Sequence, residues 1–499
     1  MPISGLFRLP HIATIHDTMH PQGTSPSPAT LAEPRLPEGR LVVVANRLPV
    51  SRSREEPRED GTGHEWKTSP GGLVSALAPI LRAADGAWVG WSGASGEVPP
   101  PFHHDGLHLH PVGLDEEELE TFYQGFCNTT LWPLYHDCVR WPEFHRRWWH
   151  PYASVNERFA EAASASLRSG DTAWIHDYHL QLVPKFLREI RPDVKIGFFS
   201  HIPFPPIELF AQLPWRRQIL EGLLGADLLG FQTGFGAKNF VRAVRRYTQA
   251  RGTGNTIEFE GRRVKVGGFP ISIDTQRYKR LAAKPEVQER ARKIRQNIGP
   301  DKKIFLGVDR LDYTKGIDRR LRAFETLLQQ LGPNADKVAF IQLAVPSREL
   351  VPQYAQIRNV VEQHVGRING DWGTPDHVPV HYMYRSLPQD ELVAHYLAAD
   401  VMAVTPLRDG MNLVAKEYVA TRLNLDGVLV LSEFTGAEQE LKRAVMVNPH
   451  DIDGMASAFR YAMEMPKSQV SQRMTALGRV VERNDVHLWA DNFLGSLNH

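Results

Sequence analysis

Cysteine is almost absent from this sequence, which has only Cys127 and Cys138 among its 499 residues. Two cysteines are too few for a disulfide framework in a chain of this length, and no CxxC spacing is present for a zinc or redox site. We therefore expect two free, half-buried thiols in a reducing compartment, which indicates the cytoplasm.

An excess of charge is also missing, since 58 basic residues face 57 acidic ones and the net charge is +1. General binding to nucleic acid or to a membrane surface needs a basic excess, so we expect neither partner. No run of about 18 apolar residues appears, which excludes a membrane-spanning helix. Residues 1–38 are rich in Pro, Ser and Thr and lack the apolar core of a signal peptide, so we expect a disordered extension.

Short motifs that identify several enzyme classes are missing as well. The first strand is not followed by GxGxxG, and no P-loop, HExxH or EF-hand pattern occurs, so a dinucleotide fold and a P-loop kinase are not supported. The stretch Gly90–Gly96 is not GxSxG, which argues against a hydrolase elbow. One DxD occurs at Asp451–Asp453, but it opens a helix over Gly454–Met465 and is interpreted as an N-cap. We expect no metal and no cofactor.

What the sequence does contain is a recurring pattern of short apolar strands that end in polar residues and precede helical stretches. Continuously apolar strands alternating with helices indicate an α/β fold with parallel sheets flanked by helices, and ligands bind such sheets beyond the carboxyl ends of the strands. The strands, with their polar ends in parentheses, are Leu41–Ala45 (Asn46, Arg47), Ala173–Ile175 (His176–His179), Ile196–Phe199 (Ser200, His201), Ile304–Val308 (Asp309, Arg310), Val338–Val345 (Ser347, Arg348), Val401–Val404 (Thr405–Asn412) and Gly427–Leu431 (Ser432, Glu433).

The chain is about three times the usual domain size, so two large domains are expected. The division falls near Phe269–Arg277, which gives a first domain over 39–270 and a second over 271–477. Residues 478–499 form a last helix with an apolar stripe, which packs either on its own domain or, as we predict, back on the first. The stripe consists of Leu488, Trp489, Phe493 and Leu497.

The segment Thr405–Glu417 places a helix amino end directly after a strand. Free backbone N–H groups and the helix dipole at such an end favour a phosphate or a sugar hydroxyl. Asp409 can accept hydrogen bonds from sugar hydroxyls, and Glu417 can hold the two hydroxyls of a ribose. The alternative, in which Asp409 is an N-cap and Glu417 is a solvated helix residue, stays open.

The segment Val308–Gly316 holds Arg310 and Lys315, five residues apart in a loop after a strand. Both can reach one diphosphate, because Arg offers a forked contact and Lys a point charge. The alternative is a surface pair bridged to Asp309 or Asp312.

Two further groups follow strands of the first half. His176–His179 and His201 match no zinc spacing, so these histidines are interpreted as hydrogen-bonding groups and Asp177 as an acceptor near an incoming hydroxyl. Arg47 at the end of the first strand is a candidate phosphate ligand, and Gly71 with Gly72 lets backbone N–H groups approach a phosphate. Arg348 offers another phosphate ligand from the second half.

Taken together, these segments closely resemble the trehalose-6-phosphate synthase family, retaining glucosyltransferases of family 20 with two Rossmann-like domains facing across a cleft (the GT-B arrangement). The resemblance runs in the same order from about Arg40 to the carboxyl end. It is carried by VVVANRLP, SPGGL, WVGWSG, FYQGFCNTTLWPLYH, WIHDYHL, GFFSHIPFP, DLLGFQT, VDRLDYTKG, the Arg348 segment, INGDWG and TPLRDGMNLVAKEYVA.

The resemblance implies transfer of glucose from a UDP-, ADP- or GDP-glucose to glucose 6-phosphate, giving trehalose 6-phosphate, by a homo-oligomer, expected to be a tetramer. It implies front-face substitution without a covalent intermediate, in which the leaving phosphate oxygen takes the proton. The implied catalytic residues are Asp177, His201, Arg310, Lys315 and Asp409. The implied acceptor site is Arg47, Tyr123, Trp132, Asp177 and Arg348. The implied donor site is Gly71, Gly72, His201, Arg310, Lys315, Asp409, Gly410, Met411, Asn412, Leu413, Val414, Ala415, Lys416 and Glu417.

Two departures from the family pattern stand out. The insertion Arg52–Trp66 is longer than in the shorter bacterial forms, and Leu387 stands where some relatives have an aromatic residue, which leaves nucleotide preference open. Three alternatives remain at this point: an enzyme of the same shape that uses glycerol 3-phosphate or makes a pseudo-disaccharide, a non-catalytic regulatory subunit of a trehalose-making complex, and a phosphorylase-like enzyme with pyridoxal phosphate. The intact charged residues disfavour the regulatory subunit.

Overall fold

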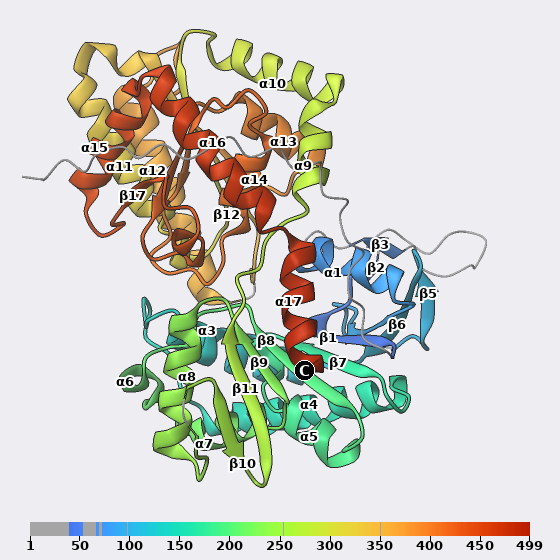
Figure 1. Cartoon of the computed structure of the whole chain (residues 1–499). Coiled ribbons are helices and arrows are strands. Elements are labelled where there is room, and N and C mark those ends of the chain that lie inside the picture. Colours follow the sequence, from blue (N-terminus) through green and yellow to red (C-terminus); the bar gives the residue numbers. More distant parts are fainter. Residues whose placement is uncertain (1–38, 53–65, 69–71, 97, 253, 350) are drawn as a thin grey trace, which may run out of the picture. The chain divides into compact units, whose positions relative to one another are not determined.

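The structure is a computed structural model that describes residues 39–52, 66–68, 72–96, 98–252, 254–349 and 351–499. Residues 1–38 and Gly71, for which we made predictions, lie outside these ranges. The described chain contains two large sheets, one in each half of the sequence (Figure 1). In the described residues no helix is long and apolar enough to cross a membrane.

The first sheet has nine strands in the order β10-β11-β9-β8-β7-β1-β4-β6-β5. All neighbouring strands run parallel except at the two edges, where β10 is antiparallel to β11 and β5 to β6. The strands are β1 (Leu41–Arg47), β4 (Ala87–Trp91), β5 (Phe102–His104), β6 (Leu107–Val112), β7 (Thr172–His176), β8 (Lys195–Ser200), β9 (Leu228–Phe231), β10 (Thr256–Phe259) and β11 (Arg262–Gly268).

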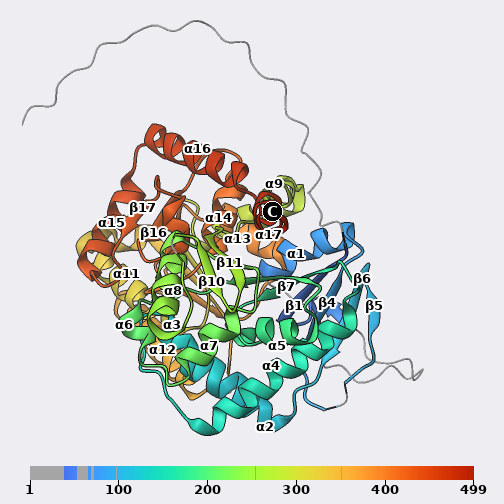
Figure 2. The same ribbon diagram turned by 60° about the horizontal axis from the view of Figure 1, so that its bottom comes forward.

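Both faces of this sheet are buried, which explains why its central strands are apolar without alternation. Val42, Val44 and Phe198 belong to one core, which also contains residues of the helices that Figure 2 shows along that face. Leu41 and Val43 point to the other core, where α1 (Gly72–Ala83) packs. The helices of the first core are α4 (Arg146–Ser166), α5 (Val183–Ile190), α7 (Arg216–Leu223) and α8 (Gly234–Tyr247).

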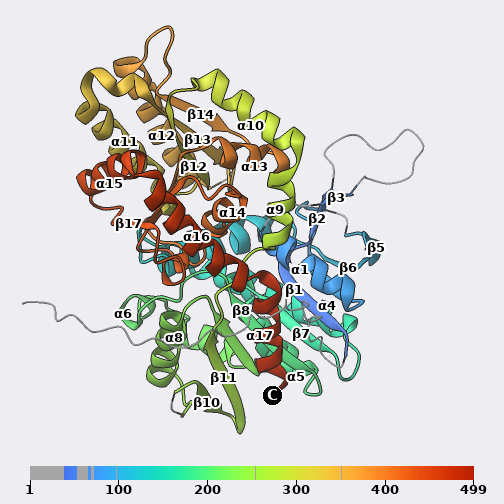
Figure 3. The same cartoon turned by 45° about the horizontal axis from the view of Figure 1, so that its top comes forward.

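The second sheet has six strands, all parallel, in the order β14-β13-β12-β15-β16-β17 (Figure 3). They are β12 (Lys303–Arg310), β13 (Val338–Val345), β14 (Val380–Tyr384), β15 (Val401–Val404), β16 (Val428–Ser432) and β17 (Val445–Val447). One face packs on α11 (Ile317–Leu331), α12 (Pro352–Trp372) and α15 (Ile452–Glu464). The other packs on α9 (Thr275–Ala283), α10 (Pro285–Ile298), α13 (Gln389–Ala398), α14 (Leu413–Thr421) and α16 (Lys467–Arg483).

The last helix, α17 (Val486–Asn498), packs on the first sheet rather than on the second (Figure 1). Its Trp489 and Phe493 rings lie 4.9 and 4.7 Å from the Trp174 ring. Gly197 in β8 and Gly230 in β9 permit this approach, since a Cβ would stand 2.8 and 2.6 Å from the Phe493 ring. The helix therefore links the end of the chain to the middle of the first sheet.

Each of the seven strands predicted from the sequence is present, within one or two residues at its ends. Cys127 and Cys138 are free thiols, as predicted, but only Cys138 is half-buried, since Cys127 lies fully inside the first core. The predicted N-cap is also confirmed, because the Asp451 carboxylate accepts a hydrogen bond from the Gly454 N–H at 2.8 Å. The fold class is therefore the predicted one: parallel α/β sheets flanked by helices.

Candidate active site

The carboxyl ends of strands from both sheets line one cavity of about 650 Å³. The loops after β1, β7 and β8 contribute from the first sheet, and those after β12, β13 and β15 contribute from the second, together with the start of α14. The lining residues that the sequence predicted are Arg47, Tyr123, Trp132, Asp177, His201, Arg310, Lys315, Arg348, Asp409, Met411, Asn412, Leu413, Val414 and Glu417.

Asp177 sits at a sharp corner directly after β7, with a positive φ of 76° that a non-glycine residue rarely adopts. Its carboxylate accepts a hydrogen bond from the main-chain N–H of His201 at 3.1 Å, which joins the ends of β7 and β8. Burial raises the pKa of Asp177 to about 6, while backbone N–H groups and the charges of Arg310 and Arg348 act in the opposite direction. Asp177 is thus a buried acceptor held in a strained but well-supported position.

Arg310 and Lys315 reach the cavity from the loop after β12. The Lys315 ammonium is buried and lies 2.6 Å from the Asp409 carboxylate, so the two predicted donor segments meet. The Arg310 guanidinium lies 5.4 Å from the centre of the Trp132 ring, and within the described ranges it has no ion-pair partner. The alternative of a surface pair bridged to Asp309 or Asp312 is therefore not what forms. Arg310 stays available for an anion.

Arg348 crosses from the second sheet to residues of the first. Its guanidinium lies over Trp132 at 3.8 Å from the ring centre and donates to the Tyr178 hydroxyl at 3.0 Å. The Arg348 guanidinium also forms an ion pair with the Asp312 carboxylate at 3.1 Å, and both side chains are almost fully buried. The Tyr354 hydroxyl bonds to both members of this pair.

Arg348, Arg310 and Lys315 together lower the pKa of Asp312, although burial alone would raise it. Asp312 is therefore charged, and it fixes Arg348 at the wall of the cavity.

The loop Asp409–Asn412 leads into α14. Asn412 has a left-handed φ of 69° and caps the helix, because its side chain accepts from the Ala415 N–H. Asp409 accepts a hydrogen bond from the Asn412 amide at 3.1 Å, in addition to its ion pair with Lys315. Asp409 is thus not the N-cap, and its carboxylate lines the cavity at the amino end of the helix.

Glu417, one turn further along α14, is buried rather than solvated. The Tyr396 hydroxyl donates to its carboxylate at 2.8 Å. Burial raises the pKa of Glu417, and the hydrogen bonds from Tyr396 and Tyr278 act against that rise. Because the carboxylate lines the cavity, it can still accept hydrogen bonds from a ligand.

Some residues predicted for the donor site do not line the cavity. Lys416 points away from it, since its ammonium bonds to the Ile271 carbonyl at 2.9 Å and to Glu440 at 2.6 Å. Ala415 is buried inside α14, and Gly72 is the first residue of α1. Gly71 lies outside the described residues. For these positions only main-chain contacts with a ligand would fit the prediction.

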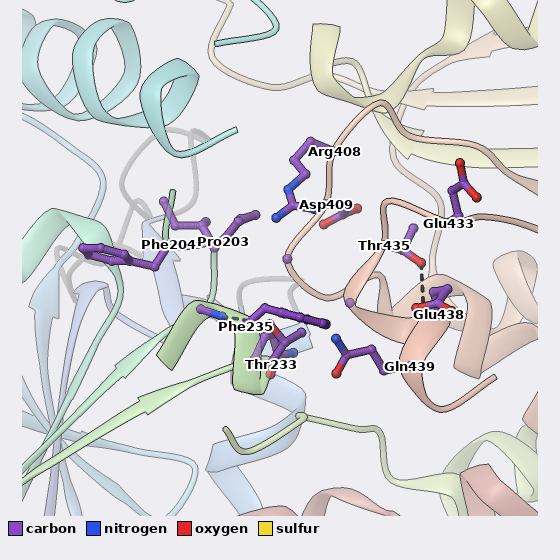
Figure 4. Close-up of a pocket in the computed structure, with 15 residues that line it drawn as sticks. Pro203, Phe204, Thr233, Phe235, Arg408, Asp409, Glu433, Thr435, Glu438 and Gln439 are labelled. Carbon is purple, nitrogen blue, oxygen red and sulfur yellow. Dashed lines mark hydrogen bonds between the residues drawn. The ribbon is translucent and has the colours of Figure 1, made fainter. Parts of the chain in front are cut away.

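Gly410 lines a second, smaller crevice of about 210 Å³ instead. Figure 4 shows Phe235 and Gln439 facing the same space, with Arg408 above them. Gly410 is tightly enclosed, because a Cβ would stand 2.6 Å from the His201 carbonyl oxygen. The close approach explains why glycine is needed in the loop that carries Asp409.

Several residues in or next to the cavity were not among the predicted site residues. His136 and His176 line the cavity, and Asp312, Tyr178 and Tyr354 hold Arg348. Asp312 and His176 stood within motifs that were noticed, so the signal was present but was read as a possible ion-pair partner or a lone hydrogen-bonding group. Tyr354 lies in α12 and carries no local motif, so only the tertiary structure identifies it.

The arrangement has two chemical halves. Arg310, Lys315 and the amino end of α14 form a cationic and dipolar region suited to a diphosphate. Arg47 and Arg348 line the same cavity and offer two more guanidinium groups for an anion, and Asp177 adds a buried carboxylate. A cavity with several cations and a buried carboxylate suits group transfer between two phosphorylated molecules.

Comparison with known proteins assigns the family. The model of glycosyltransferase family 20 matches residues 39–499. The chain belongs to this family. A trehalose-6-phosphate synthase of Mycolicibacterium smegmatis is 52% identical to this chain over an alignment of 466 positions that covers 92% of this chain and 92% of that protein. A trehalose-6-phosphate synthase of Mycobacterium tuberculosis is 51% identical over an alignment of 474 positions that covers 92% of this chain and 94% of that protein.

Solved structures of the family superpose on this chain. An α,α-trehalose-phosphate synthase (UDP-forming) of Burkholderia xenovorans in complex with glucose-6-phosphate has a TM-score of 0.84 and 35% identity, covering 92% of this chain and all 100% of that one. An E. coli structure bound with UDP-2-fluoro glucose also has a TM-score of 0.84, with 34% identity, covering 92% of this chain and 99% of that one. The predicted arrangement of two facing Rossmann-like domains is thereby confirmed.

Proposed function

We propose that this family 20 chain transfers glucose, with retention, from a nucleoside diphosphate glucose to glucose 6-phosphate and so makes trehalose 6-phosphate. The observation that carries the proposal is the cavity, in which Arg310 and Lys315 from one sheet face Asp177 and Arg47 from the other. Relatives more than 50% identical are trehalose-6-phosphate synthases, which supports the same substrates here.

The donor would lie against the second sheet. Arg310 has no carboxylate partner in the part of the chain described, and Lys315 can exchange its contact with Asp409 for a diphosphate oxygen. The main chain of Met411–Leu413 and the carboxylate of Asp409 are placed to hold the sugar, and Glu417 to hold a ribose. His201 would contact the same sugar from the first sheet.

The acceptor would lie against the first sheet. Arg47 lies 4.8 Å from the centre of the Trp91 ring, and Arg348 is fixed by Asp312, so two guanidinium groups are available for the 6-phosphate. Tyr123 stacks on His179 with 5.9 Å between ring centres and would form a wall of the sugar pocket together with Trp132. Asp177 would accept a hydrogen bond from a sugar hydroxyl.

In the proposed reaction the bond between glucose C1 and the diphosphate oxygen breaks, and a bond from C1 to the acceptor hydroxyl oxygen forms on the same face. The hydroxyl proton passes to the leaving phosphate oxygen, so charge and atoms balance without a protein nucleophile. Arg310 and Lys315 would stabilise the charge that develops on the diphosphate. Such groups act mainly in the transition state when the site excludes water, which raises kcat.

The test is turnover of the purified full-length protein with single substrates and with pairs. We expect release of nucleoside diphosphate and formation of trehalose 6-phosphate only when a nucleotide glucose and glucose 6-phosphate are both present. Turnover with glycerol 3-phosphate but not with glucose 6-phosphate would replace the proposed acceptor. Absence of turnover with any pair would favour a regulatory subunit. The same assay with UDP-, ADP- and GDP-glucose identifies the donor nucleotide.

The oligomeric state belongs to the proposal as well. We propose a homo-oligomer, of four subunits, in which residues 39–270 form the acceptor domain and residues 271–477 the donor domain. Light scattering during gel filtration measures the mass directly. A mass near the chain's 56.4 kDa would contradict the oligomer.

A further inference from the structure

Besides Trp132 and His179, which line the cavity, four aromatic side chains in one cluster beside it carry buried nitrogen atoms that have no hydrogen-bond partner among the residues described. They are Trp174 Nε1, His176 Nε2, His201 Nδ1 and Trp489 Nε1. The four rings form a chain of contacts from Trp489 through Trp174 and His176 to His201. The ring centres are 4.9 Å apart for Trp489 and Trp174, 4.9 Å for Trp174 and His176, and 5.2 Å for His176 and His201. Buried polar groups are nearly always satisfied, so this cluster needs a cause.

The two histidines are joined by one hydrogen bond, with 3.0 Å between His176 Nδ1 and His201 Nε2. A neutral imidazole has one donor nitrogen and one acceptor nitrogen, so a bond between two neutral rings leaves one outer nitrogen as donor and the other as acceptor. Burial lowers the pKa of His201 to about 3 and that of His176 well below its usual value, so both rings are neutral near pH 7. The two tautomers are therefore coupled.

The indole groups select one direction of this bond. An indole N–H can only donate. Trp174 lies two residues before His176 on β7, so both side chains stand on the same face of the sheet. The Trp174 and His176 ring centres are 4.9 Å apart, whereas those of Trp489 and His201 are 6.4 Å apart, so we take His176 Nε2 as the acceptor that an indole reaches through a buried water. His176 then carries its proton on Nδ1 and donates it to His201 Nε2, and His201 keeps its own proton on Nδ1.

We propose that His176 is a positioning residue that holds His201 in the Nδ1-protonated tautomer, so that His201 offers a neutral hydrogen-bond donor to the donor sugar. The part concerning the sugar rests on the proposed function. Trp489 is a residue of α17. Its ring packs on Trp174, and its ring centre lies 6.4 Å from that of His201. The last helix of the chain thereby supports the wall of the cavity that receives the sugar.

The kinetic test compares two substitutions of His176. In His176→Asn the side-chain amide can still donate to His201 Nε2, whereas His176→Leu removes the bond at similar size. We expect His176→Leu to lower kcat/KM for the nucleotide sugar about tenfold, with an unchanged KM for glucose 6-phosphate, and His176→Asn to stay within about threefold of the wild type. In a His201→Ala background, His176→Leu should cause no further loss. Equal losses for both substitutions, or additive losses in the double variant, would overturn the proposal.

A second readout does not depend on activity. Long-range 1H–15N spectra of the full-length enzyme labelled at histidine report which imidazole nitrogen carries the proton, and the His201 signals are assigned by their disappearance in His201→Ala. We expect the proton on Nδ1 of His201 in the wild type and in His176→Asn, and a mixture of tautomers in His176→Leu. His179→Leu is the matched control, because His179 lines the same cavity and should leave the His201 signals unchanged. A wild-type His201 with its proton on Nε2 would overturn the assignment even if turnover is absent, so failure of the positioning role and failure of the proposed function are separable.

Discussion

At the scale of single residues, two arginines that line the cavity differ in their neighbouring groups. Arg348 has a fixed carboxylate partner in Asp312, while Arg310 faces the cavity with only an aromatic ring nearby. The buried ion pair holds Arg348 in a fixed position at the cavity wall, whereas the charge of Arg310 is not compensated by a carboxylate of the described residues until a ligand binds. We therefore expect substitutions at these two positions to have different consequences.

For Arg310→Ala we expect kcat to fall about 100-fold or more, because the charge on the leaving diphosphate loses one stabilising group in the transition state. The thermal unfolding midpoint should stay the same, since no described ion pair is broken. Steady-state kinetics and thermal melting measure the two quantities. Arg322→Ala, an exposed arginine on α11, is the control and should change neither. A normal rate for Arg310→Ala would remove it from the reaction.

For Asp177 the pH dependence of stability has a defined sign. Its pKa is about 6 in the folded protein against an ordinary value of 3.8, so between these values the folded state binds more protons than the unfolded state. Stability therefore falls as pH rises through this window, by up to about 3 kcal/mol. Asp177→Asn should make the ligand-free protein more stable at pH 7.5 than the wild type, with the difference vanishing below about pH 4, while its activity falls.

Asp312→Asn is the matched comparison with the opposite sign, because the folded-state pKa of Asp312 is lowered. Its ionised form stabilises the fold above the unfolded pKa, and that contribution is lost as pH falls. The substitution also leaves Arg348 buried without a partner, which costs about 3–5 kcal/mol. Urea denaturation at several pH values measures both variants. If both shift stability in the same direction at pH 7.5, the assigned environments are incorrect.

Much of this residue-level picture was predictable, and the part that was not has a physical reason. Strand-end residues such as Arg47, Asp177 and Arg310 were found because the carboxyl ends of parallel strands converge. The role of Asp312 as the partner of Arg348 was missed, since the two are 36 positions apart and meet only through packing. Lys416 was placed at the donor by its position in a motif, but its side chain turns to Glu440 because α14 buries that face.

At the scale of secondary structure elements, the sequence predicted the strands better than their surroundings. The apolar runs gave β12, β13 and β15 nearly residue by residue, because a strand buried on both faces has a strong and simple pattern. The π-helix η1 (Leu119–Leu131), which carries Tyr123, has no such pattern and was not predicted. We predicted that α17 packs on the first domain, but its apolar stripe alone allowed two possibilities, because a stripe does not identify its partner.

The contact of α17 with the first sheet gives a prediction at this scale. Gly230→Ala would place a Cβ 2.6 Å from the Phe493 ring, so we expect a loss of about 1–3 kcal/mol of unfolding free energy. Phe493→Leu in the same chain should recover part of the loss. The control is Gly478→Ala in α16, where no atom lies within 4 Å of the new Cβ and a gain of about 0.5–1 kcal/mol is expected. Equal effects of the two alanine substitutions would contradict the described packing.

At the scale of the whole chain, both halves contribute side chains to one cavity. Arg348 of the second sheet donates to Tyr178 of the first, and α17 returns from the second half to β8 and β9. The sequence predicted two α/β domains and a cavity between strand ends, because domain size and strand pattern are local properties. It did not predict which cross-domain contacts fix the cavity, because these depend on distances between residues far apart in the chain.

A complex with both substrates tests most directly whether one sheet binds the pyrophosphate while the other presents the sugar phosphate. A crystal structure of the full-length protein with nucleoside diphosphate and glucose 6-phosphate should place pyrophosphate oxygens about 2.7–2.9 Å from nitrogens of Arg310 and Lys315. The 6-phosphate should contact Arg47 and Arg348, with a sugar hydroxyl beside Asp177. A nucleotide bound elsewhere, with Arg310 and Lys315 free of it, would contradict the claim.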